Sequence, residues 1–182
     1  MSSLLLHVCC GPCATHAIDV LKPCYRLVGC FHNPNIHPGP EYFRRLEAAV
    51  IVCRASSIPI WTTLYDPAPW LDAVRGAEQE REGGGRCEIC FRQRLEATAE
   101  IARLGRFDLF ATTLTLSPHK DAGKINSIGE EVASLFSVSY LPSDFKKEHG
   151  FHKSIEASRG LGLYRQRYCG CRFSHPDARG DR

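Results

Sequence analysis

The stretch Leu4–Cys13, which reads LLLHVCCGPC, is the part of the chain that best predicts both the fold and the chemistry. Its apolar first half, Leu4–Val8, is typical of a strand buried in a parallel sheet. Three cysteines follow directly, and apolar residues at helical spacing then predict a helix over Cys13–Lys22. The chain therefore begins with a buried strand, a cysteine-rich turn and a helix.

The rest of the chain repeats this alternation of strand and helix. Further strands are expected at Tyr25–Phe31, Ile58–Leu64, Asp108–Leu114 and Val138–Leu141. Helices are expected at Glu41–Ser57, from Trp70 to about Ala77, at Cys87–Leu104, from after Lys120 to about Phe136 and at Ser154–Gly160. The alternation predicts one α/β domain over residues 1–174, with a Rossmann-like three-layer fold and a mostly parallel sheet. The polar residues 175–182 are expected to form a disordered tail.

Cysteines and polar residues follow several of the expected strands. They are Cys9 and Cys10 after the first strand, Asn33 and Asn35 after the second, and Thr112, Thr113 and Ser117 at the end of the fourth. In open α/β sheets, ligands bind beyond the carboxyl ends of the strands. We therefore expect these side chains to converge on one rim of the sheet, where the functional site should lie.

The overall composition is that of an ordinary globular chain. Its 182 residues are 43% hydrophobic and 24% charged, and a net charge of +3 does not by itself indicate a nucleic-acid partner. No apolar run approaches the roughly 20 residues of a membrane span, and the first residues lack the basic segment of a signal peptide. We expect a cytoplasmic protein without membrane contact. Small basic clusters are simplest to interpret as solvated faces; they are Arg44 with Arg45, Arg92 with Arg94, Lys146 with Lys147, and Arg165 with Arg167.

The content of ten cysteines is unusual for a protein of this kind. The chain is too long and too rich in helical patterns to resemble the disulfide framework of a small secreted domain. Cys24, Cys30 and Cys53 stand alone in apolar sequence and are interpreted as small core residues. The other cysteines come in groups, which favours metal or redox chemistry.

Four of the grouped cysteines could complete one metal site. Cys9, Cys10, Cys87 and Cys90 offer the four thiolates that a tetrahedral zinc site or an iron–sulfur cube requires. The x-x spacer between the later pair, at a helix start, lets both sulfurs face one way, and the helix dipole favours their negative charge. Adjacent cysteines suit separate irons of a cluster better than one small zinc ion. A 4Fe–4S cluster is the favoured interpretation, with structural zinc and free or redox thiols as the alternatives.

The sequence Cys169-Gly170-Cys171 indicates a different chemistry. One glycine between two cysteines permits a small, strained disulfide ring, and strain makes a disulfide easier to reduce. We interpret the pair as redox-active, and the alternative is two more metal ligands or two idle thiols. Cys13, beside the proposed cluster, could be a spare thiolate, a ligand of a second metal or a proton donor.

Taken together, these motifs resemble those of the QueH-type epoxyqueuosine reductases, from about Leu4 to Ser174. Each motif alone is unspecific, whereas the complete set is highly specific. The matching motifs are His7–Cys13, Asn33–Pro38 with Glu41 and Tyr42, Gly84–Phe91, Thr112–Leu114 with Ser117–Lys120, Ser143–Lys147, and Tyr164–Gln166 with Tyr168–Cys171.

The resemblance implies an oxidoreductase that acts on tRNA. Such an enzyme removes the epoxide oxygen of epoxyqueuosine at the wobble position and so completes queuosine biosynthesis. By the same resemblance, a 4Fe–4S cluster is held by Cys9, Cys10, Cys87 and Cys90, and a redox-active disulfide is formed by Cys169 and Cys171. The partners are then a tRNA bearing epoxyqueuosine and an electron donor that the sequence does not identify.

The stoichiometry of this reaction suggests further roles. Converting an epoxide to an alkene takes two electrons and two protons, whereas a 4Fe–4S cube normally passes one electron at a time. The second electron could come from the Cys169 and Cys171 pair, or from a mononuclear iron near Cys13 that binds the epoxide oxygen. No corrinoid-binding signature is visible, so a cobalamin-independent enzyme is expected. The candidate proton donors are Asp144, His119, Lys120 and Cys13.

The tRNA substrate suggests a further set of binding residues. Bases of an anticodon loop can be splayed out of the stack into a pocket. The candidate substrate-binding residues are Asn33, Asn35, Thr112, Ser117, Lys120 and Arg165. The candidate contacts to phosphates are Arg44, Arg45, Lys146, Lys147, Arg165 and Arg167.

Two functions of other classes stay open at this point. An adenylating tRNA-thiolation enzyme could use a similar sheet, but it needs a Ser-Gly-Gly-x-Asp-Ser-like phosphate loop where Cys9–Cys13 stands. A non-catalytic zinc module that binds RNA would be colourless and would carry zinc. An iron–sulfur protein would instead be brown, with absorption near ~400 nm.

Overall fold

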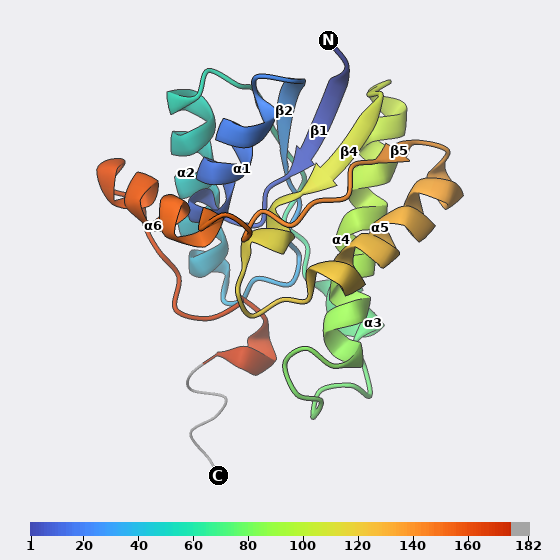
Figure 1. Cartoon of the computed structure of the whole chain (residues 1–182). Coiled ribbons are helices and arrows are strands. Elements are labelled where there is room, and N and C mark those ends of the chain that lie inside the picture. Colours follow the sequence, from blue (N-terminus) through green and yellow to red (C-terminus); the bar gives the residue numbers. More distant parts are fainter. Residues whose placement is uncertain (176–182) are drawn as a thin grey trace.

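The computed structural model describes residues 1–175, which form a five-stranded sheet covered by helices (Figure 1). The strand order is β3-β2-β1-β4-β5, and every neighbouring pair is parallel. This confirms the predicted Rossmann-like α/β fold. Of the tail that is expected to be disordered, residues 176–182 lie outside the described residues. The strands are β1 (Ser3–His7), β2 (Arg26–Phe31), β3 (Ile60–Thr62), β4 (Leu109–Thr112) and β5 (Ser139–Tyr140).

Helices cover both faces of the sheet (Figure 1). Because side chains alternate along a strand, Leu4 and Leu6 of β1 pack with α1 and α2, whereas Leu5 packs with α4 and α5. All three leucines are fully buried, which explains why this strand has an unbroken apolar sequence. The helices concerned are α1 (Gly11–Leu21), α2 (Gly39–Ala55), α4 (Gly85–Leu104) and α5 (Ala122–Phe136).

The C-terminal part of the chain returns to the carboxyl rim of the sheet. After α6 (Gly150–Gly160), which packs on α1, the chain runs back past the loop that follows β2. There Ile36 forms an isolated bridge with Cys171, and the backbone N–H of His37 donates to the carbonyl of Gly170 at 2.8 Å. Within residues 1–175, no helix has both the length and the apolar character needed to cross a membrane.

The cysteine-rich turn is held by the start of α1, which begins at Gly11 rather than at the predicted Cys13. The Sγ atom of Cys10 caps the helix by accepting a hydrogen bond from the backbone N–H of Cys13 at 3.3 Å, and Pro12 occupies the first turn. A Cβ atom at Gly11 would lie 2.6 Å from the backbone of Ala48 in α2, so the two helices can approach this closely only at a glycine.

Two strands are shorter at the rim than the sequence predicts. The strand expected at Asp108–Leu114 ends at Thr112, because the Thr112 side chain accepts a hydrogen bond from the backbone N–H of Leu114 at 3.1 Å and a 3₁₀ turn follows. The strand expected at Ile58–Leu64 is reduced to β3. The remaining elements are α3 (Ala68–Ala73), the 3₁₀ turn η1 (Thr113–Leu116) and the 3₁₀ turn η2 (Arg172–Ser174).

Candidate functional site

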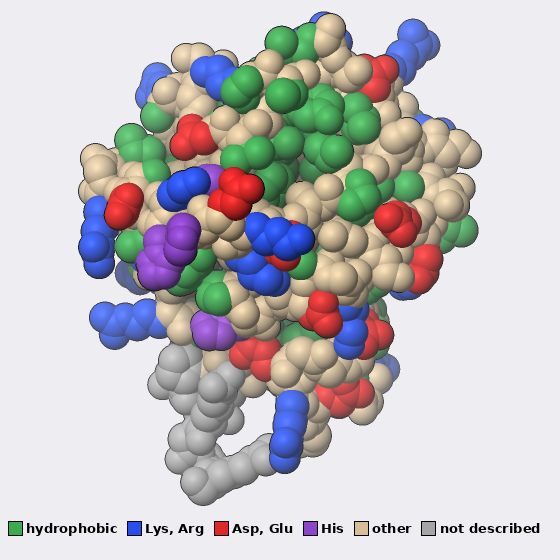
Figure 2. Space-filling view, viewed as in Figure 1, with side chains coloured by type: hydrophobic (Ala, Val, Ile, Leu, Met, Phe, Trp, Pro, Cys, Tyr) green, Lys and Arg blue, Asp and Glu red, His purple; other side chains and the backbone are tan. Residues whose placement is uncertain are grey.

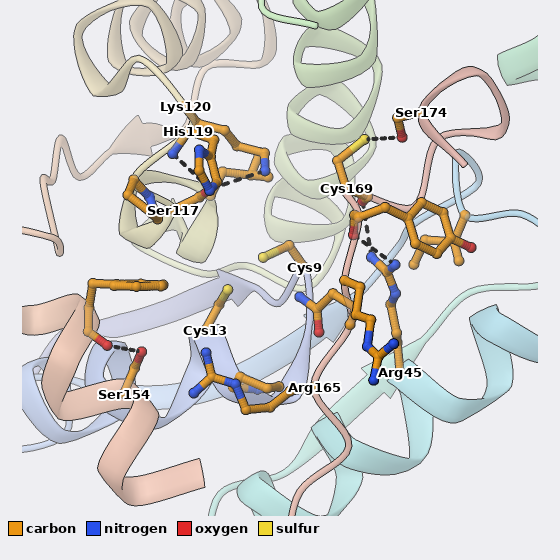
Figure 3. A pocket seen from close by; sticks show the side chains of 18 of the residues that line it. Cys9, Cys13, Arg45, Ser117, His119, Lys120, Ser154, Arg165, Cys169 and Ser174 are labelled. Carbon is orange, nitrogen blue, oxygen red and sulfur yellow. Dashed lines mark hydrogen bonds between the residues drawn. The ribbon is translucent and has the colours of Figure 1, made fainter. Parts of the chain in front are cut away.

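Two neighbouring cavities lie beyond the carboxyl ends of β1 and β4. The larger has a volume of about 690 Å³, and the smaller one of about 50 Å³. Cys9 and Cys13 line the larger cavity, and Cys87 and Cys90 line the smaller one. Cys169 lines both, so all three cysteine groups meet at this rim. Figure 3 shows the sulfurs of Cys9 and Cys13 directed towards the centre, with His119 and Lys120 on one side and Cys169 on another.

The cysteines of the first turn form a compact group of three sulfurs. The Sγ atoms of Cys9, Cys10 and Cys13 all lie within 4.8 Å of one another, and those of Cys9 and Cys10 are 3.8 Å apart. Among residues 1–175, this is the one group of three or more potential metal-ligating atoms that is so compact. The end of β1 places Cys9, and the helix cap places Cys10, so the group is built almost entirely by local structure.

The three sulfurs have different affinities for a proton. Hydrogen bonds from Cys10 and Cys13 hold the pKa of Cys9 well below its usual range, and the nearby positive charges of Arg94 and Lys120 add to this effect. Burial raises the pKa of Cys10 to about 12, and contact with the other two sulfurs raises the pKa of Cys13. The hydroxyl of Thr113 also donates to the Cys9 sulfur at 3.2 Å. Negative charge in the group therefore belongs mainly to Cys9.

The second pair, Cys87 and Cys90, projects from the first turns of α4. Since they are three residues apart, the two side chains share one face of the helix. The Sγ atom of Cys87 accepts a hydrogen bond from the backbone N–H of Gly83 at 3.2 Å, and the Sγ atom of Cys90 lies 3.9 Å from a guanidinium nitrogen of Arg94. Burial raises the pKa of both thiols. A cation or a metal would be needed to keep both as thiolates.

The third pair, Cys169 and Cys171, is present as free thiols. Hydrogen bonds from Cys171 and then from Ser174 outweigh burial and lower the pKa of Cys169 to about 5, whereas the pKa of Cys171 is raised by its contact with Cys169. Gly170, between them, has a φ of +104°, and a Cβ atom there would lie 2.8 Å from a nitrogen of Arg45. Two cysteines with unlike proton affinities are thus held next to each other.

Buried residues of α2 hold this third pair in place. The Arg45 side chain is 2% exposed and forms an ion pair with Glu41 at 2.7 Å. Its other nitrogens donate to the carbonyl of Cys169 at 3.0 Å and to that of Tyr168 at 3.1 Å. A loop more than 120 residues away in the chain is therefore anchored by a charge inside the protein.

Comparison with known proteins identifies the family. The family model for the epoxyqueuosine reductase QueH matches residues 4–177. The chain belongs to the QueH family. The family expected from the sequence motifs is thus confirmed.

Curated relatives of this QueH-family chain agree with the match. The epoxyqueuosine reductase QueH of Streptococcus pyogenes serotype M1 is 40% identical over 178 residues, which cover 94% of this chain and 70% of that protein. The one from Thermotoga maritima is 35% identical over 180 residues, which cover 96% of this chain and 91% of that protein. The range of the family model, residues 4–177, includes all three cysteine groups.

Solved structures share the fold at much lower identity. The U34-tRNA thiolase NcsA of Methanococcus maripaludis, solved with its [4Fe-4S] cluster, is 15% identical with a TM-score of 0.59, and the match covers 98% of this chain and 63% of that one. A predicted subunit of a tRNA methyltransferase from Methanocaldococcus jannaschii is 13% identical with a TM-score of 0.55, covering 84% and 76%. At such identities the likeness concerns the fold alone.

The substrate-binding residues expected in this QueH-family chain have two kinds of position. Ser117, Lys120 and Arg165 line the larger cavity. Asn33 is buried, with its amide nitrogen donating to the carbonyl of Val8 at 2.9 Å. Thr112 is also buried, 2.8 Å from a ring nitrogen of His7. Asn35 lines the smaller cavity, and its buried side-chain oxygen has no hydrogen-bond partner among the described residues. Four of the six residues thus line a cavity and two are held by contacts inside the protein, and a substrate role for each stays a prediction.

Two expectations about charged residues need correction. Arg45 was expected to contact phosphates, but its guanidinium is buried and engaged by Glu41 and two backbone carbonyls. Arg94 was expected on a solvated face, but it is 4% exposed and lines both cavities. The clue for Arg94 is its position four residues after Cys90, which places both on one face of α4.

Asp144, a candidate proton donor, lines neither of the two cavities. One of its carboxylate oxygens lies 3.7 Å from the ammonium group of Lys146. That lysine also donates to the carbonyl of Lys120 at 2.9 Å, so the pair braces the loop that carries Lys120. Of the other candidates, Cys13, His119 and Lys120 all line the larger cavity.

Proposed function

We infer that this protein is an epoxyqueuosine reductase, which removes the epoxide oxygen of epoxyqueuosine in tRNA in the final step of queuosine biosynthesis. The observation that carries this conclusion is the family match over residues 4–177. The meeting of three cysteine groups around two neighbouring cavities supports it, because deoxygenation of an epoxide needs a source of electrons at the substrate.

A 4Fe–4S cluster held by Cys9, Cys10, Cys87 and Cys90 is the proposed cofactor. When bound, such a cluster would pass electrons one at a time. The chemistry of the donor set fits: all four are free thiols, two belong to the compact sulfur group and two share a face of α4. Buried N–H groups of Trp70 and Arg94 without partners among the described residues also suit a sulfur-rich ligand.

Cys13 belongs to the compact sulfur group but is left over by the four-ligand assignment. It is proposed to bind a second, mononuclear iron or to donate a proton to the leaving oxygen. The first role is supported by its closeness to two other sulfurs, and the second by the raised pKa of its thiol, which keeps a proton available. His119 and Lys120 are the other donors within the cavity.

The Cys169 and Cys171 pair is proposed to supply electrons and protons. Oxidation of two thiols to a disulfide releases two electrons and two protons, which equals what an epoxide needs to become an alkene and water. Cys169 lines both cavities, so its sulfur lies next to both the proposed cluster ligands and the space for substrate. The disulfide must then be reduced by an external donor. A corrinoid is not part of this proposal.

The larger cavity is proposed to receive the splayed-out base of the anticodon loop. Arg165, Arg167 and Tyr168 line both this cavity and a third of about 490 Å³, which also contains Arg44 and Tyr164. A chain of nucleotides could therefore pass from one cavity to the next beside cationic and aromatic side chains. Figure 2 shows basic and acidic side chains mixed across the face of the molecule that is turned towards the viewer.

The test is anaerobic purification followed by assay of iron, sulfide and zinc, and then incubation with epoxyqueuosine-containing tRNA and a strong reductant. Mass spectrometry of the digested nucleosides should show conversion to queuosine. A brown protein with about four irons per chain would support the cofactor. A colourless zinc protein, or a fully loaded protein that leaves epoxyqueuosine unchanged, would refute the proposal.

A further inference from the structure

A buried positive charge stands between the cysteine groups without a carboxylate partner. Arg94 is 4% exposed, and it takes part in none of the ion pairs formed among residues 1–175. Its Nε atom also lacks a hydrogen-bond partner in this part of the chain. A buried guanidinium without a counter-charge is costly, so a negative group is expected beside it in the working protein.

The groups that face Arg94 are mainly thiols. One guanidinium nitrogen lies 3.9 Å from the Cys90 sulfur, and the Arg94 side chain lines both cavities, the larger with Cys9 and the smaller with Cys90. The acidic residues that line the same cavities, Glu82 and Asp121, are exposed. The imidazoles of the buried His7 and the half-buried His32 supply no negative charge in either protonation state.

The position of this guanidinium is set from both sides of the site. Its second terminal nitrogen donates to the side-chain oxygen of Asn33 at 2.5 Å, and the amide nitrogen of Asn33 donates to the carbonyl of Val8. Val8 directly precedes Cys9. A chain of hydrogen bonds therefore links the cysteines of α4 to those that follow β1, and this link explains the buried position of Asn33.

We propose that Arg94 is a positioning residue whose fixed charge neutralises part of the negative charge of the thiolate-bound centre and raises its reduction potential. Each electron added to the centre increases its negative charge, and a cation at close range in a buried site stabilises the reduced form more than the oxidised form. The same side chain, which Asn33 orients, links the pair Cys9 and Cys10 to the pair Cys87 and Cys90 through hydrogen bonds. This inference rests on the proposed iron–sulfur cofactor.

The test compares Arg94→Gln, which removes the charge, with Arg94→Lys, which keeps it. Arg103→Gln is the matched control, because Arg103 is an exposed residue in the last turn of the same helix. Each anaerobically prepared holoprotein is assayed for iron and sulfide and titrated spectroscopically against potential. Arg94→Gln should show a ratio of reduced to oxidised cluster at least tenfold lower at the wild-type midpoint, which is a shift of about 59 mV for one electron. Arg94→Lys should shift less, and Arg103→Gln should match the wild type.

The remaining outcomes decide separate questions. A wild-type protein without iron and sulfide refutes the proposed cofactor, whatever the variants do. A loaded Arg94→Gln variant with the wild-type potential overturns the electrostatic role. If Arg94→Gln does not bind the cluster, the Arg94→Lys variant decides. A reduction potential close to that of the wild type supports the role of charge. A tenfold or greater change in the ratio of reduced to oxidised cluster overturns it. Failure of both variants to fold or to load overturns the proposal in favour of a purely structural role.

Discussion

The first and last cysteine groups of this protein are built in opposite ways. Cys9, Cys10 and Cys13 sit on a turn held by a strand end and a helix cap, so their geometry comes from neighbouring residues. Cys169 and Cys171 lie on a loop near the C-terminus that is held by α2 and by the segment after β2. A ligand group made by local structure suits a permanent cofactor. A loop anchored from a distance suits a pair that must change its bonding during turnover.

The largest effect on cofactor content and turnover is expected from substitution in the first group, Cys9, Cys10 and Cys13. Cys9→Ser replaces the thiol that carries most of the negative charge, so the proposed cluster should be lost together with all turnover. Iron and sulfide assays of the anaerobically purified variant check this. Loss of a ligand should exceed the roughly 10–100-fold loss of metal affinity that is typical for residues behind the ligands. Cys24→Ser is the control, because Cys24 is exposed and lines neither cavity. Full iron and sulfide in Cys9→Ser would refute the ligand assignment.

Substitutions in the C-terminal pair, Cys169 and Cys171 (the distal group), should separate binding of the cofactor from turnover. Cys169→Ser and Cys171→Ser should each retain iron and sulfide, since neither belongs to the proposed ligand set, but conversion of epoxyqueuosine should fall to background. Multiple-turnover assays with tRNA and metal analysis of the same sample measure the two properties side by side. Unchanged turnover in either variant would remove the pair from the mechanism, and loss of iron would place it among the ligands.

The anchor of the distal group should matter for stability. Arg45→Ala leaves the carboxylate of Glu41 buried without its partner, and breaking a buried pair in this way costs about 3–5 kcal/mol of unfolding free energy. Urea denaturation measures the change. The neighbouring Arg44 is exposed, so Arg44→Ala should stay within about 0.5 kcal/mol of the wild type. If the two variants unfold alike, Arg45 does not anchor the loop as the structure indicates.

The same contrast shows what could be predicted from sequence. The strand at Leu4–Val8 and the three cysteines after it were predictable, because an apolar run and the turn that ends it are encoded by adjacent residues. Even there the sequence placed the start of the helix at Cys13, since the capping role of a cysteine side chain is uncommon. The parallel sheet followed from the regular alternation of strand and helix.

Burial of the two arginines could not be predicted in the same way. The spacing of Glu41 and Arg45 suggests a helical ion pair, but the carbonyls that enclose Arg45 come from Tyr168 and Cys169. Arg94 lies two residues after Arg92 in the sequence, and its partner Asn33 belongs to a different part of the fold. Pattern rules treat charges as solvated, whereas contacts between distant segments decide which of them are enclosed.

The smallest expected effect concerns proton affinity within the distal loop. Because the pKa of Cys169 is lowered to about 5, this thiol is ionised above that pH and becomes protonated as the pH falls through it. Its alkylation by iodoacetamide, followed by mass spectrometry of its peptide in the reduced protein, should be nearly constant between pH 6 and pH 8. An ordinary thiol, with a pKa of about 8.5, would react about tenfold faster for each pH unit over that range.

The hydroxyl of Ser174 provides the matched variant, since it lies 2.9 Å from the Cys169 sulfur. Ser174→Ala should move the midpoint of the alkylation profile to a modestly higher pH and leave the anchoring by Arg45 intact. If the alkylation rate of Cys169 in the wild type rises tenfold for each pH unit, the loop does not stabilise a thiolate. If the midpoint instead moves in Arg44→Ala and not in Ser174→Ala, distant charge controls the thiol. The expected result separates the two tasks: distant residues position the loop, and neighbouring hydrogen bonds set its reactivity.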